Sequence, residues 1–344
     1  MRILLATYAF YPSVGGLEEV NALLADAFAE RGHAVKILTM TPAEHPDASA
    51  YEIIRQPKPG ELIRALSWCD VFLQANVGFR LGWPNFLLRR PWVIALHGNL
   101  DTEEGRDGVF GWKSWVKRLS LRSAAGVVAV SEAVARRTFP RARVIGNPYR
   151  KALFRALRNE ERRYDLVFLG RLVSDKGLDL LIDALPLLQT IDLRPSLLVI
   201  GGGPEEAALR ERCRAHGVEA QVTFAGIQQG EALVSLLNCS AIMVIPSIWE
   251  EPFGIVALEG IACGCSVVAA ASGGLPEAVG PCGIIFPKGD RNALAAALAT
   301  LLRDEGKILQ LRAHADAHLA RYDPYVVAEK YLEILGEVCR AERS

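Results

Sequence analysis

The sequence lacks the long apolar run that a transmembrane helix requires. Although 51% of its 344 residues are hydrophobic, no apolar run reaches the roughly 18 to 20 residues of a membrane span. The first residues, 1–7, form a short apolar segment without the cleavage site of a signal peptide. We therefore expect a cytoplasmic protein without a membrane span.

Paired cysteine motifs are also missing. The seven cysteines are scattered, and none belongs to a Cys-x-x-Cys pair. Cys263 and Cys265 are too close together for a disulfide framework and have no histidine neighbours for zinc. We expect reduced, mostly buried thiols, as in cytosolic proteins, and no metal site.

Two common nucleotide-binding motifs are absent as well. The chain contains no Gly-x-x-x-x-Gly-Lys-Ser/Thr loop and no Gly-x-Gly-x-x-Gly fingerprint. A P-loop nucleotidase is therefore excluded, and a nicotinamide-dependent dehydrogenase is disfavoured. No repeats and no low-complexity tract occur.

The net charge of zero hides an uneven distribution. Residues 1–163 contain 24 Lys/Arg and 16 Asp/Glu, whereas residues 164–344 contain 15 and 23, so the two parts carry +8 and −8. A basic first half suits an anionic lipid surface or an anionic substrate. No recognition module accompanies it, so we expect no nucleic-acid partner. The basic, aromatic segment 112–122 fits either a helix on a membrane surface or a helix packed on the first domain.

Strand-like and helix-like segments alternate along the chain, which is the pattern of α/β proteins with doubly wound parallel sheets. The length exceeds what one core usually serves, so we expect two Rossmann-like domains. We expect a first domain over residues 1–150, a linker over 151–163, a second domain over 164–321 and a final helical segment over 322–344. The carboxyl ends of the strands would line a shared cleft.

Two cations follow the first strand of the second half. Arg171 and Lys176 lie in the turn 170–177, between a strand and a helix. The carboxyl edge of an α/β sheet is where ligands bind, and an Arg fork beside a Lys point charge suits a diphosphate. The alternative is a solvated basic turn.

Two carboxylates straddle a predicted helix start in the segment 247–259. Glu251 precedes a Phe-Gly turn, and Glu259 lies in the apolar helix that follows. A helix start presents unpaired N–H groups that bind phosphate, and flanking carboxylates suit sugar hydroxyls. The alternative is an exposed loop acid and an unrelated helix acid.

Three further turns are candidates for a ligand site. The glycines 201–203 and Gly15-Gly16 each follow a strand and let a backbone approach a ligand, or simply form tight or flexible turns. Glu18 lies in the first helical turn after Gly16. His97 ends an apolar strand, followed by Gly98 and Asn99, and either hydrogen-bonds a hydroxyl or phosphate or is structural.

The order of these motifs is more specific than any one of them. Gly-Gly-x-Glu, Gly-Arg-x-x-x-x-Lys-Gly, Gly-Gly-Gly-Pro-Glu, Glu-Pro-Phe-Gly-x-x-x-x-Glu and Gly-Gly-Leu-Pro-Glu follow one another along the chain. This series resembles the large retaining GT-B glycosyltransferase family of bacterial mannosyl-, glucosyl- and N-acetylglucosaminyltransferases (glycosyltransferase family 4-like, glycosyl transferases group 1). The resemblance covers essentially the whole chain and is loosest in residues 40–120.

The resemblance implies a GT-B fold in which the two domains face a central cleft and the last helix crosses back to the first domain. It implies catalytic roles for Arg171, Lys176, Glu251 and His97. It places the donor at Gly16, Gly202, Ile227, Phe253, Gly254, Ile255 and Glu259, and the acceptor at Gly15, Glu18 and Asn99. Arg171 and Lys176 would hold the diphosphate, Glu259 the ribose, and Glu251 the sugar hydroxyls.

The expected activity is transfer of a hexosyl or N-acetylhexosaminyl group, with retention and without metal or cofactor, from a UDP- or GDP-linked sugar. The expected acceptor is a glycan or lipid-linked glycan of an envelope or exopolysaccharide, reached at the inner face of the membrane through the basic half. One alternative is a soluble acceptor such as a sugar phosphate. A catalytically silent nucleotide-binding scaffold is the other, which the joint presence of Arg171, Lys176, Glu251 and Glu259 disfavours.

Overall fold

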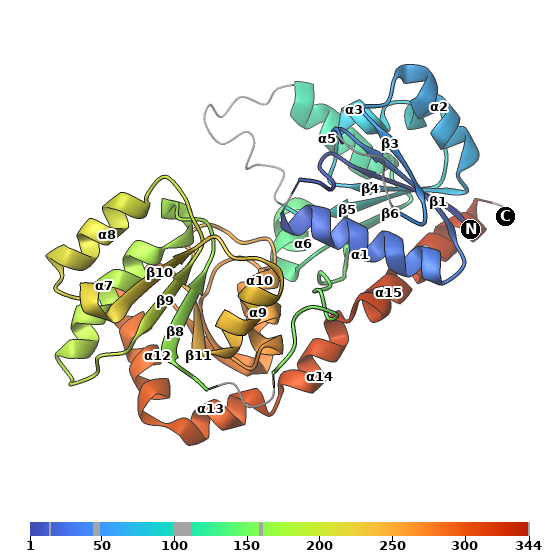
Figure 1. Ribbon diagram of the computed structural model, residues 1–344. Helices are drawn as coiled ribbons and strands as arrows, with labels where there is room; N and C mark the ends of the chain where they lie inside the picture. Colours follow the sequence, from blue (N-terminus) through green and yellow to red (C-terminus); the bar gives the residue numbers. More distant parts are fainter. Residues whose placement is uncertain (14, 44–48, 99–111, 158–160, 343–344) are drawn as a thin grey trace. The chain divides into compact units, whose positions relative to one another are not determined.

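The computed structural model describes residues 1–13, 15–43, 49–98, 112–157 and 161–342. The chain divides into two compact units (Figure 1). Unit 1 comprises Met1–Pro148 and Tyr322–Ser344, and unit 2 comprises Tyr149–Arg321.

Unit 1 is built on a parallel sheet. Its described strands are β1 (Arg2–Thr7), β2 (Ala34–Thr39), β3 (Glu52–Arg55), β4 (Val71–Ala75), β5 (Trp92–Leu96), β6 (Gly126–Ala129) and β7 (Arg143–Val144). They lie side by side in the order β3-β2-β1-β4-β5-β6-β7. The central strands β4 and β5 are buried along their whole length, as parallel sheets covered on both faces require. The strand order reverses between β1 and β4.

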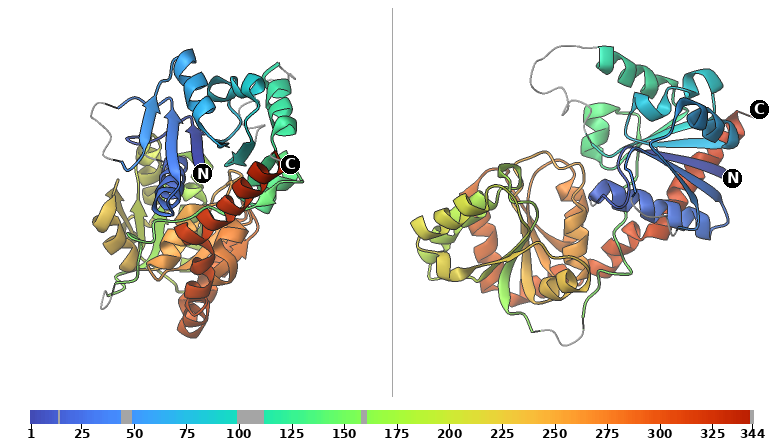
Figure 2. Two further views of the ribbon diagram at one scale, coloured as in Figure 1. Left: turned by 90° about the vertical axis from the view of Figure 1, so that its right-hand side faces the viewer. Right: turned by 45° about the horizontal axis from the view of Figure 1, so that its top comes forward.

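Helices cover both faces of this sheet (Figures 1 and 2). The helices of the first 148 residues are α1 (Gly16–Glu30), α2 (Pro59–Trp68), α3 (Phe79–Gly82), α4 (Asn85–Leu88), α5 (Trp112–Ser123) and α6 (Glu132–Thr138). The last helix, α15 (Pro324–Ala341), lies beside α1 on one face, and α2 and α3 lie on the other. Arg31 of α1 pairs with Glu329 of α15 at 2.8 Å. The end of the chain therefore belongs to the amino-terminal unit.

Unit 2 repeats the architecture. Its strands are β8 (Tyr164–Leu169), β9 (Leu197–Ile200), β10 (Val222–Gly226), β11 (Ser240–Ile245), β12 (Ser266–Ala270) and β13 (Gly283–Phe286). Within the described residues they form one parallel sheet in the order β10-β9-β8-β11-β12-β13. The order reverses between β8 and β11. Both sheets are parallel and doubly wound, so the predicted α/β fold class is confirmed.

The helices of unit 2 also form two layers (Figure 1). They are α7 (Leu178–Gln189), α8 (Glu206–Ala215), α9 (Gly230–Asn238), α10 (Ile255–Ala262), α11 (Leu275–Val279), α12 (Arg291–Arg303), α13 (Glu305–Arg312) and α14 (Ala315–Leu319). Short 3-10 turns occur at η2 (Ser174–Lys176), η3 (Glu219–Gln221), η4 (Gly280–Cys282) and η5 (Ala320–Tyr322). Aliphatic residues of α7 and α12 pack on the strands, including Leu181, Leu185 and Leu298. This core supports the loops at the carboxyl end of the sheet.

The segment that we expected to be a linker is anchored to unit 2. The side chain of Asn238, at the end of α9, accepts a hydrogen bond from Leu157 N–H at 2.7 Å and donates to the Arg155 carbonyl at 3.0 Å. Arg162 donates to the Gly264 carbonyl at 3.0 Å and also to that of Ser240. The chain passes from unit 1 to unit 2 between Pro148 and Tyr149, and back between Arg321 and Tyr322.

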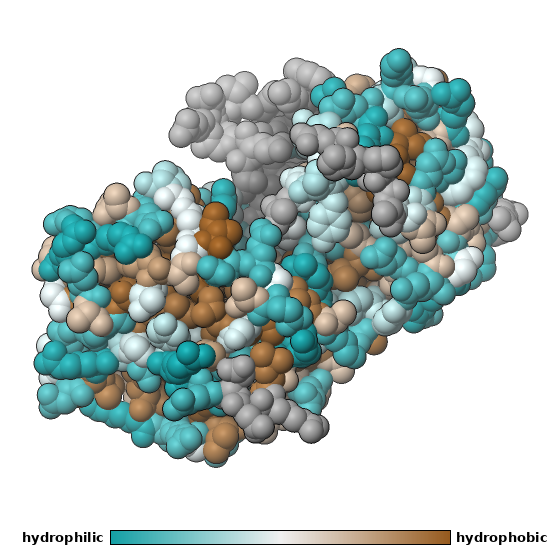
Figure 3. All heavy atoms as spheres, in the orientation of Figure 1, coloured by the Kyte–Doolittle hydropathy of each residue, from teal (hydrophilic) through white to brown (hydrophobic). Residues whose placement is uncertain are grey.

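This organisation changes the meaning of the charge distribution. Unit 1 contains 21 Lys/Arg and 19 Asp/Glu, and unit 2 contains 18 and 20. The difference between the halves of the sequence shrinks because the acidic last helix joins unit 1 and the basic segment 149–163 joins unit 2. On the face seen in Figure 3, apolar residues form separate patches among hydrophilic ones. We expected a strongly basic first domain, but the net charge of unit 1 is only +2.

All seven cysteines are free and buried, as the sequence predicted. Burial raises the pKa of the Cys69 and Cys263 thiols to about 12, which makes them unreactive at neutral pH. No helix in the part of the chain that the structure describes is both long and apolar enough to cross a membrane.

Candidate functional site

The predicted donor residues of unit 2 gather at the point where its strand order reverses. The turn that holds Arg171 and Lys176 follows β8, and the loop that holds Glu251 follows β11, the neighbouring strand. Ligands of doubly wound sheets bind at this position. The Asp175 carbonyl ties the two loops together, because it accepts hydrogen bonds from Ile248 N–H at 3.0 Å and from the Ser247 hydroxyl at 3.1 Å.

Lys176 and Glu251 form an ion pair in this site. The lysine side chain is 27% exposed and the glutamate side chain 14%. The same carboxylate oxygen of Glu251 accepts a hydrogen bond from the Ser247 hydroxyl at 2.9 Å, and Ser247 itself is fully buried. Gly177 must be glycine here, since its φ is +70° and a Cβ would lie 2.1 Å from the Pro246 carbonyl oxygen. The two predicted charges are therefore held within one rigid arrangement.

The backbone of Glu251 is held from the other side by the loop after β12. The Glu251 carbonyl accepts a hydrogen bond from Gly274 N–H at 2.8 Å. A Cβ on Gly273 would lie 2.0 Å from the same carbonyl oxygen, and the φ of Gly273 is +53°. Glu250 accepts from Gly273 N–H at 3.1 Å and pairs with Lys288. The Gly-Gly-Leu-Pro-Glu motif thus fixes the position of the acidic loop.

The helix that carries Glu259 begins directly after this loop. Gly254 precedes α10 with a φ of +102°, and no side chain caps the helix. Phe253 is buried at 2% exposure and anchors the turn. The Ala257 N–H donates to the Gly254 carbonyl at 3.0 Å, so the N–H groups of Ile255 and Val256 precede the first hydrogen bond of the helix. Glu259 lies half-buried one turn further along α10. A helix start of this kind binds anions.

Arg171 is the exposed cation of the site. It makes no ion pair with any residue that the structure describes. The adjoining glycines pack on this turn: a Cβ on Gly201 would lie 1.8 Å from the Gly170 carbonyl oxygen, and one on Gly203 2.4 Å from that of Leu172. Close backbone packing therefore explains these two glycines.

The two remaining donor residues of unit 2 lie together beside that turn. A Cβ on Gly202 would lie 3.0 Å from the Ile227 side chain, which is 72% exposed. They offer a small apolar surface next to Arg171.

His97 of unit 1 lies at the carboxyl end of β5. Its backbone N–H donates to the Asn76 side chain at 2.8 Å, and both nitrogens of its ring are buried without a hydrogen bond of good geometry. Burial lowers the pKa of His97 to about 4, and the nearby Asn147 amide opposes this shift. The ring is therefore neutral at pH 7.

The Gly-Gly turn of unit 1 forms the start of α1. Gly15 caps the helix with an extended backbone, and Gly16 is its first residue. Glu18 is only 8% exposed and accepts a hydrogen bond from the Ser13 hydroxyl at 2.9 Å. Its carboxylate holds the turn together. Asn99, predicted on the acceptor side, lies outside the described residues.

Sequence reasoning did not select Ser247, Gly273 or Lys288. Ser247 belongs to the segment 247–259 and Gly273 to the Gly-Gly-Leu-Pro-Glu motif, and a hydroxyl four positions before Glu251 was the available signal. Lys288 had no signal, because its distance from Glu250 depends on the fold. Among the residues that the structure describes, no three His, Cys, Asp or Glu side chains are grouped so that they could hold a metal ion. Metal independence remains a prediction.

Comparisons with known families match both units. The model of the family described as "Glycosyl transferases group 1" matches residues 150–318, and that of "Glycosyltransferase Family 4" matches residues 14–149. An uncharacterized glycosyltransferase of Methanocaldococcus jannaschii is 27% identical over 335 residues, which cover 81% of this chain and 83% of that protein. A D-inositol 3-phosphate glycosyltransferase of Salinispora tropica is 34% identical over 197 residues, but these cover only 54% of this chain and 40% of that one.

The fold is also similar to solved structures. The Anabaena protein HepE, crystallised in complex with UDP, superposes with a TM-score of 0.81 at 22% sequence identity, covering 98% of this chain and 100% of that chain. At this level of identity the similarity establishes the architecture of two Rossmann-like domains. The family to which the chain belongs is established by the two family models.

Proposed function

The chain belongs to the glycosyl transferases group 1, with a family 4 amino-terminal unit, and we propose that it is a retaining, metal-independent transferase of nucleotide sugars. In this proposal unit 2 binds the donor and unit 1 the acceptor. One observation supports this proposal above all: Lys176 pairs with Glu251, and the start of α10 follows directly in the same site.

The donor diphosphate fits the cationic part of the site. Breaking a glycosyl–phosphate bond leaves negative charge on the diphosphate. Arg171, Lys176 and the uncapped N–H groups at the start of α10 offer positive charge to this leaving group. With these groups in place, the reaction would need no metal ion to stabilise the departing phosphate.

The carboxylates fit the hydroxyl-bearing parts of the donor. We assign Glu251 to the sugar hydroxyls and Glu259 to the ribose, with the base beside Gly202 and Ile227. Binding of the diphosphate would draw Lys176 from Glu251, whose carboxylate would keep the Ser247 hydrogen bond and accept from sugar hydroxyls. The base is proposed to be uracil or guanine. HepE, whose fold is similar, was crystallised with UDP.

Retention follows from attack on the same face of the sugar from which the phosphate leaves. The departing phosphate would take the proton of the acceptor hydroxyl, so no carboxylate nucleophile is required, unlike in retaining glycosidases. In the donor complex Glu251 would keep the hydrogen bond from Ser247 and accept from sugar hydroxyls, which favours a binding role over a nucleophilic one. His97, neutral at pH 7, would hydrogen-bond a sugar hydroxyl or phosphate.

The acceptor is proposed to be a glycan or lipid-linked glycan of envelope or exopolysaccharide synthesis, reached from the cytoplasm at the membrane surface. Unit 1 as a whole carries only two more basic than acidic residues. Binding to an anionic membrane would therefore depend on a local basic patch and not on the net charge of the unit. The side chains of Trp112 and Trp115, which suggested a membrane-facing helix, lie outside the described residues.

A soluble acceptor such as a sugar phosphate is the second candidate. One observation favours it: the relative from Salinispora tropica is named for a phosphorylated small molecule, D-inositol 3-phosphate. Its match covers only about half of this chain, so the name supports the class of acceptor and no particular compound.

A thermal-shift panel of UDP-, GDP- and ADP-sugars tests the donor part. A ligand that binds only the folded state at 100 times its Kd stabilises it by about 2.7 kcal/mol. We expect a UDP- or GDP-sugar to raise the Tm of the wild type, and to raise it less in Lys176→Ala. Absence of a shift with every nucleotide sugar would contradict the proposal.

A further inference from the structure

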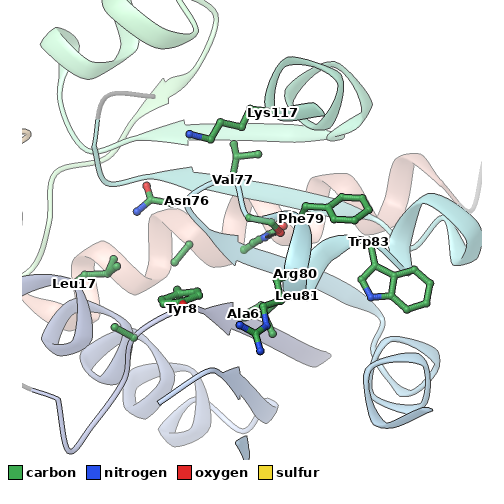
Figure 4. A pocket seen from close by; sticks show the side chains of 14 residues that line it. Ala6, Tyr8, Leu17, Asn76, Val77, Phe79, Arg80, Leu81, Trp83 and Lys117 are labelled. Atoms are coloured by element: carbon green, nitrogen blue, oxygen red, sulfur yellow. Dashed lines mark hydrogen bonds between the residues drawn. The ribbon is translucent and has the colours of Figure 1, made fainter. Parts of the chain in front are cut away.

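Unit 1 contains a large pocket of its own at the point where its strand order reverses. The cavity has a volume of about 930 Å³ and lies between the loops that follow β1 and β4 (Figure 4). Its position in unit 1 matches that of the donor site in unit 2, since each lies at the switch point of a parallel sheet. Both size and position are those of ligand-binding pockets.

The walls of the pocket are aromatic and aliphatic. Tyr8 follows β1 and is 64% exposed, and Phe79, the first residue of α3, is 51% exposed. Trp83 and Leu17 also line the cavity (Figure 4). Figure 4 shows Tyr8 on one side of the pocket and Phe79 and Trp83 on the other. Exposed aromatic rings that line a hollow mark a binding surface. The C–H faces of a sugar ring pack on such rings.

Two cations lie among these apolar residues. Arg80 and Lys117 both line the pocket, and Figure 4 shows them on different sides of it. Arg80 is exposed and makes no ion pair with any residue in the described ranges. An unpaired guanidinium at the edge of an apolar pocket favours a ligand with a phosphate group, which it can bind through two parallel N–H bonds.

Gln74 holds in place the loop between β4 and α3, the helix that carries Phe79 and Arg80. Gln74 is 2% exposed, and its side-chain amide donates to the Gly78 carbonyl at 2.6 Å. A Cβ on Gly82 would lie 2.7 Å from the Gln74 amide oxygen, so the turn closes tightly over this side chain. The side of the pocket formed by the β4–α3 loop is therefore fixed before a ligand arrives, which lowers the ordering cost of binding.

The pocket adjoins the predicted reaction residues of unit 1. Leu17 directly follows Gly16 at the start of α1, and Asn76, which lines the pocket, accepts the backbone hydrogen bond of His97 at 2.8 Å. A ligand in the pocket would thus extend from Arg80 toward the residues expected near the transferred sugar.

From these observations we infer that the pocket binds the acceptor and that this acceptor is a phosphorylated sugar. The sugar ring lies against Tyr8, and the phosphate contacts Arg80. The role of the ligand as acceptor rests on the proposed function. The binding of a phosphorylated sugar to unit 1 does not depend on it. The phosphate belongs either to a free sugar phosphate or to the head of a lipid diphosphate.

Binding without any donor tests the inference directly. Saturation-transfer NMR and calorimetry are run with hexose 1- and 6-phosphates, N-acetylhexosamine 1-phosphates and the same sugars without phosphate. We expect a phosphorylated sugar to bind the full-length wild type and the neutral sugar to bind at least tenfold more weakly. Arg80→Gln should weaken the phosphorylated ligand about 10- to 100-fold. Arg64→Gln, an exposed arginine of α2 outside the pocket, serves as the matched control.

Transfer assays then separate the two sources of the phosphate. Each phosphorylated sugar is offered free and as the head of an isoprenyl diphosphate in detergent micelles, with a UDP- or GDP-sugar as donor. The inference is supported if the wild type uses either form and if Arg80→Gln raises the KM for the acceptor but leaves the KM for the donor unchanged. Equal use of phosphorylated and neutral sugars, or an acceptor KM that Arg80→Gln leaves unchanged, overturns it. If sugar phosphates bind at Arg80 but no donor binds, the proposed function fails and the site stands.

Discussion

Lys176 and Glu251 are 75 positions apart in the chain, yet their side chains form an ion pair at the carboxyl end of β8 and β11. Ser247 supports the carboxylate, and the Gly273-Gly274 turn holds its backbone. In the proposed mechanism a donor separates the pair, because the diphosphate takes the ammonium and the sugar hydroxyls take the carboxylate. The two side chains therefore have different functions in the complex.

Lys176→Ala should lower kcat by about 10²- to 10³-fold, the usual effect of removing one group that stabilises charge in the transition state. Lys307→Ala, on α13 outside the site, is the matched control and should leave kcat unchanged. Initial rates of nucleotide release measure the effect. Full activity in Lys176→Ala would refute the assignment of Lys176 to the leaving group.

Gly273→Ala should impair the site through the backbone of Glu251. The new Cβ would lie 2.0 Å from the Glu251 carbonyl oxygen, so the acidic loop must move. Gly217→Ala has a similar φ, +66°, but its Cβ would meet nothing within 4 Å, so it isolates the cost of the backbone conformation. We expect both variants to lose stability and only Gly273→Ala to lose at least tenfold in kcat/KM for the donor. Equal kcat/KM values in folded samples would contradict this account.

Glu259→Gln should weaken the binding of nucleoside diphosphates. A hydrogen bond from a ribose hydroxyl to a carboxylate contributes about 1.5–3 kcal/mol, so the Kd for UDP or GDP should rise roughly 10- to 100-fold. Glu305→Gln, at the start of α13, is the control. Calorimetry with UDP and GDP, rather than with the sugar-linked forms, confines the test to the ribose and diphosphate.

His97 should make unit 1 sensitive to acid. Burial lowers its pKa from the ordinary 6.5 to about 4 in the folded chain, so between these two values the unfolded chain holds a proton that the folded chain does not. Stability must then fall as the pH falls from about 6.5 to 4, by roughly 3 kcal/mol in total. Between pH 6.5 and 4, the stability of His97→Gln should therefore fall by about 3 kcal/mol less than that of the wild type.

Urea unfolding at several pH values, followed by tryptophan fluorescence, measures the effect. Five of the six tryptophans belong to unit 1, so the signal reports mainly on that unit. The exposed His314→Gln is the control. An identical pH dependence in the wild type and His97→Gln would contradict a buried, neutral imidazole.

Much of the fold could be predicted because it depends on local patterns. Short apolar runs that alternate with amphipathic segments specify parallel strands and covering helices, and the structure confirms this fold class. Arg171 and Lys176 could be selected because ligands of such sheets bind after the strands, and Glu251 and Glu259 because they straddle a helix start. The pairing of Lys176 with Glu251 could not, since it depends on which strand lies next to β8.

Residues 151–163 illustrate a second limit of the sequence. Their polar, basic composition suggested a linker. In the structure, hydrogen bonds attach Arg155, Leu157 and Arg162 to the ends of helices in unit 2. Composition does not reveal whether a polar segment meets water or backbone carbonyls. For the same reason the +8 of the first 163 residues did not predict the charge of unit 1.

Proton NMR of the sugar anomeric centre tests the central claim most directly. The purified chain is incubated with UDP- and GDP-sugars and phosphorylated or lipid-linked acceptors, and the anomeric signals of donor and product are followed over time. The account predicts a glycoside with the same anomeric configuration as the donor, formed with EDTA present and strongly reduced in Lys176→Ala. An inverted product, a strict need for a divalent metal, or full activity in Lys176→Ala would contradict it.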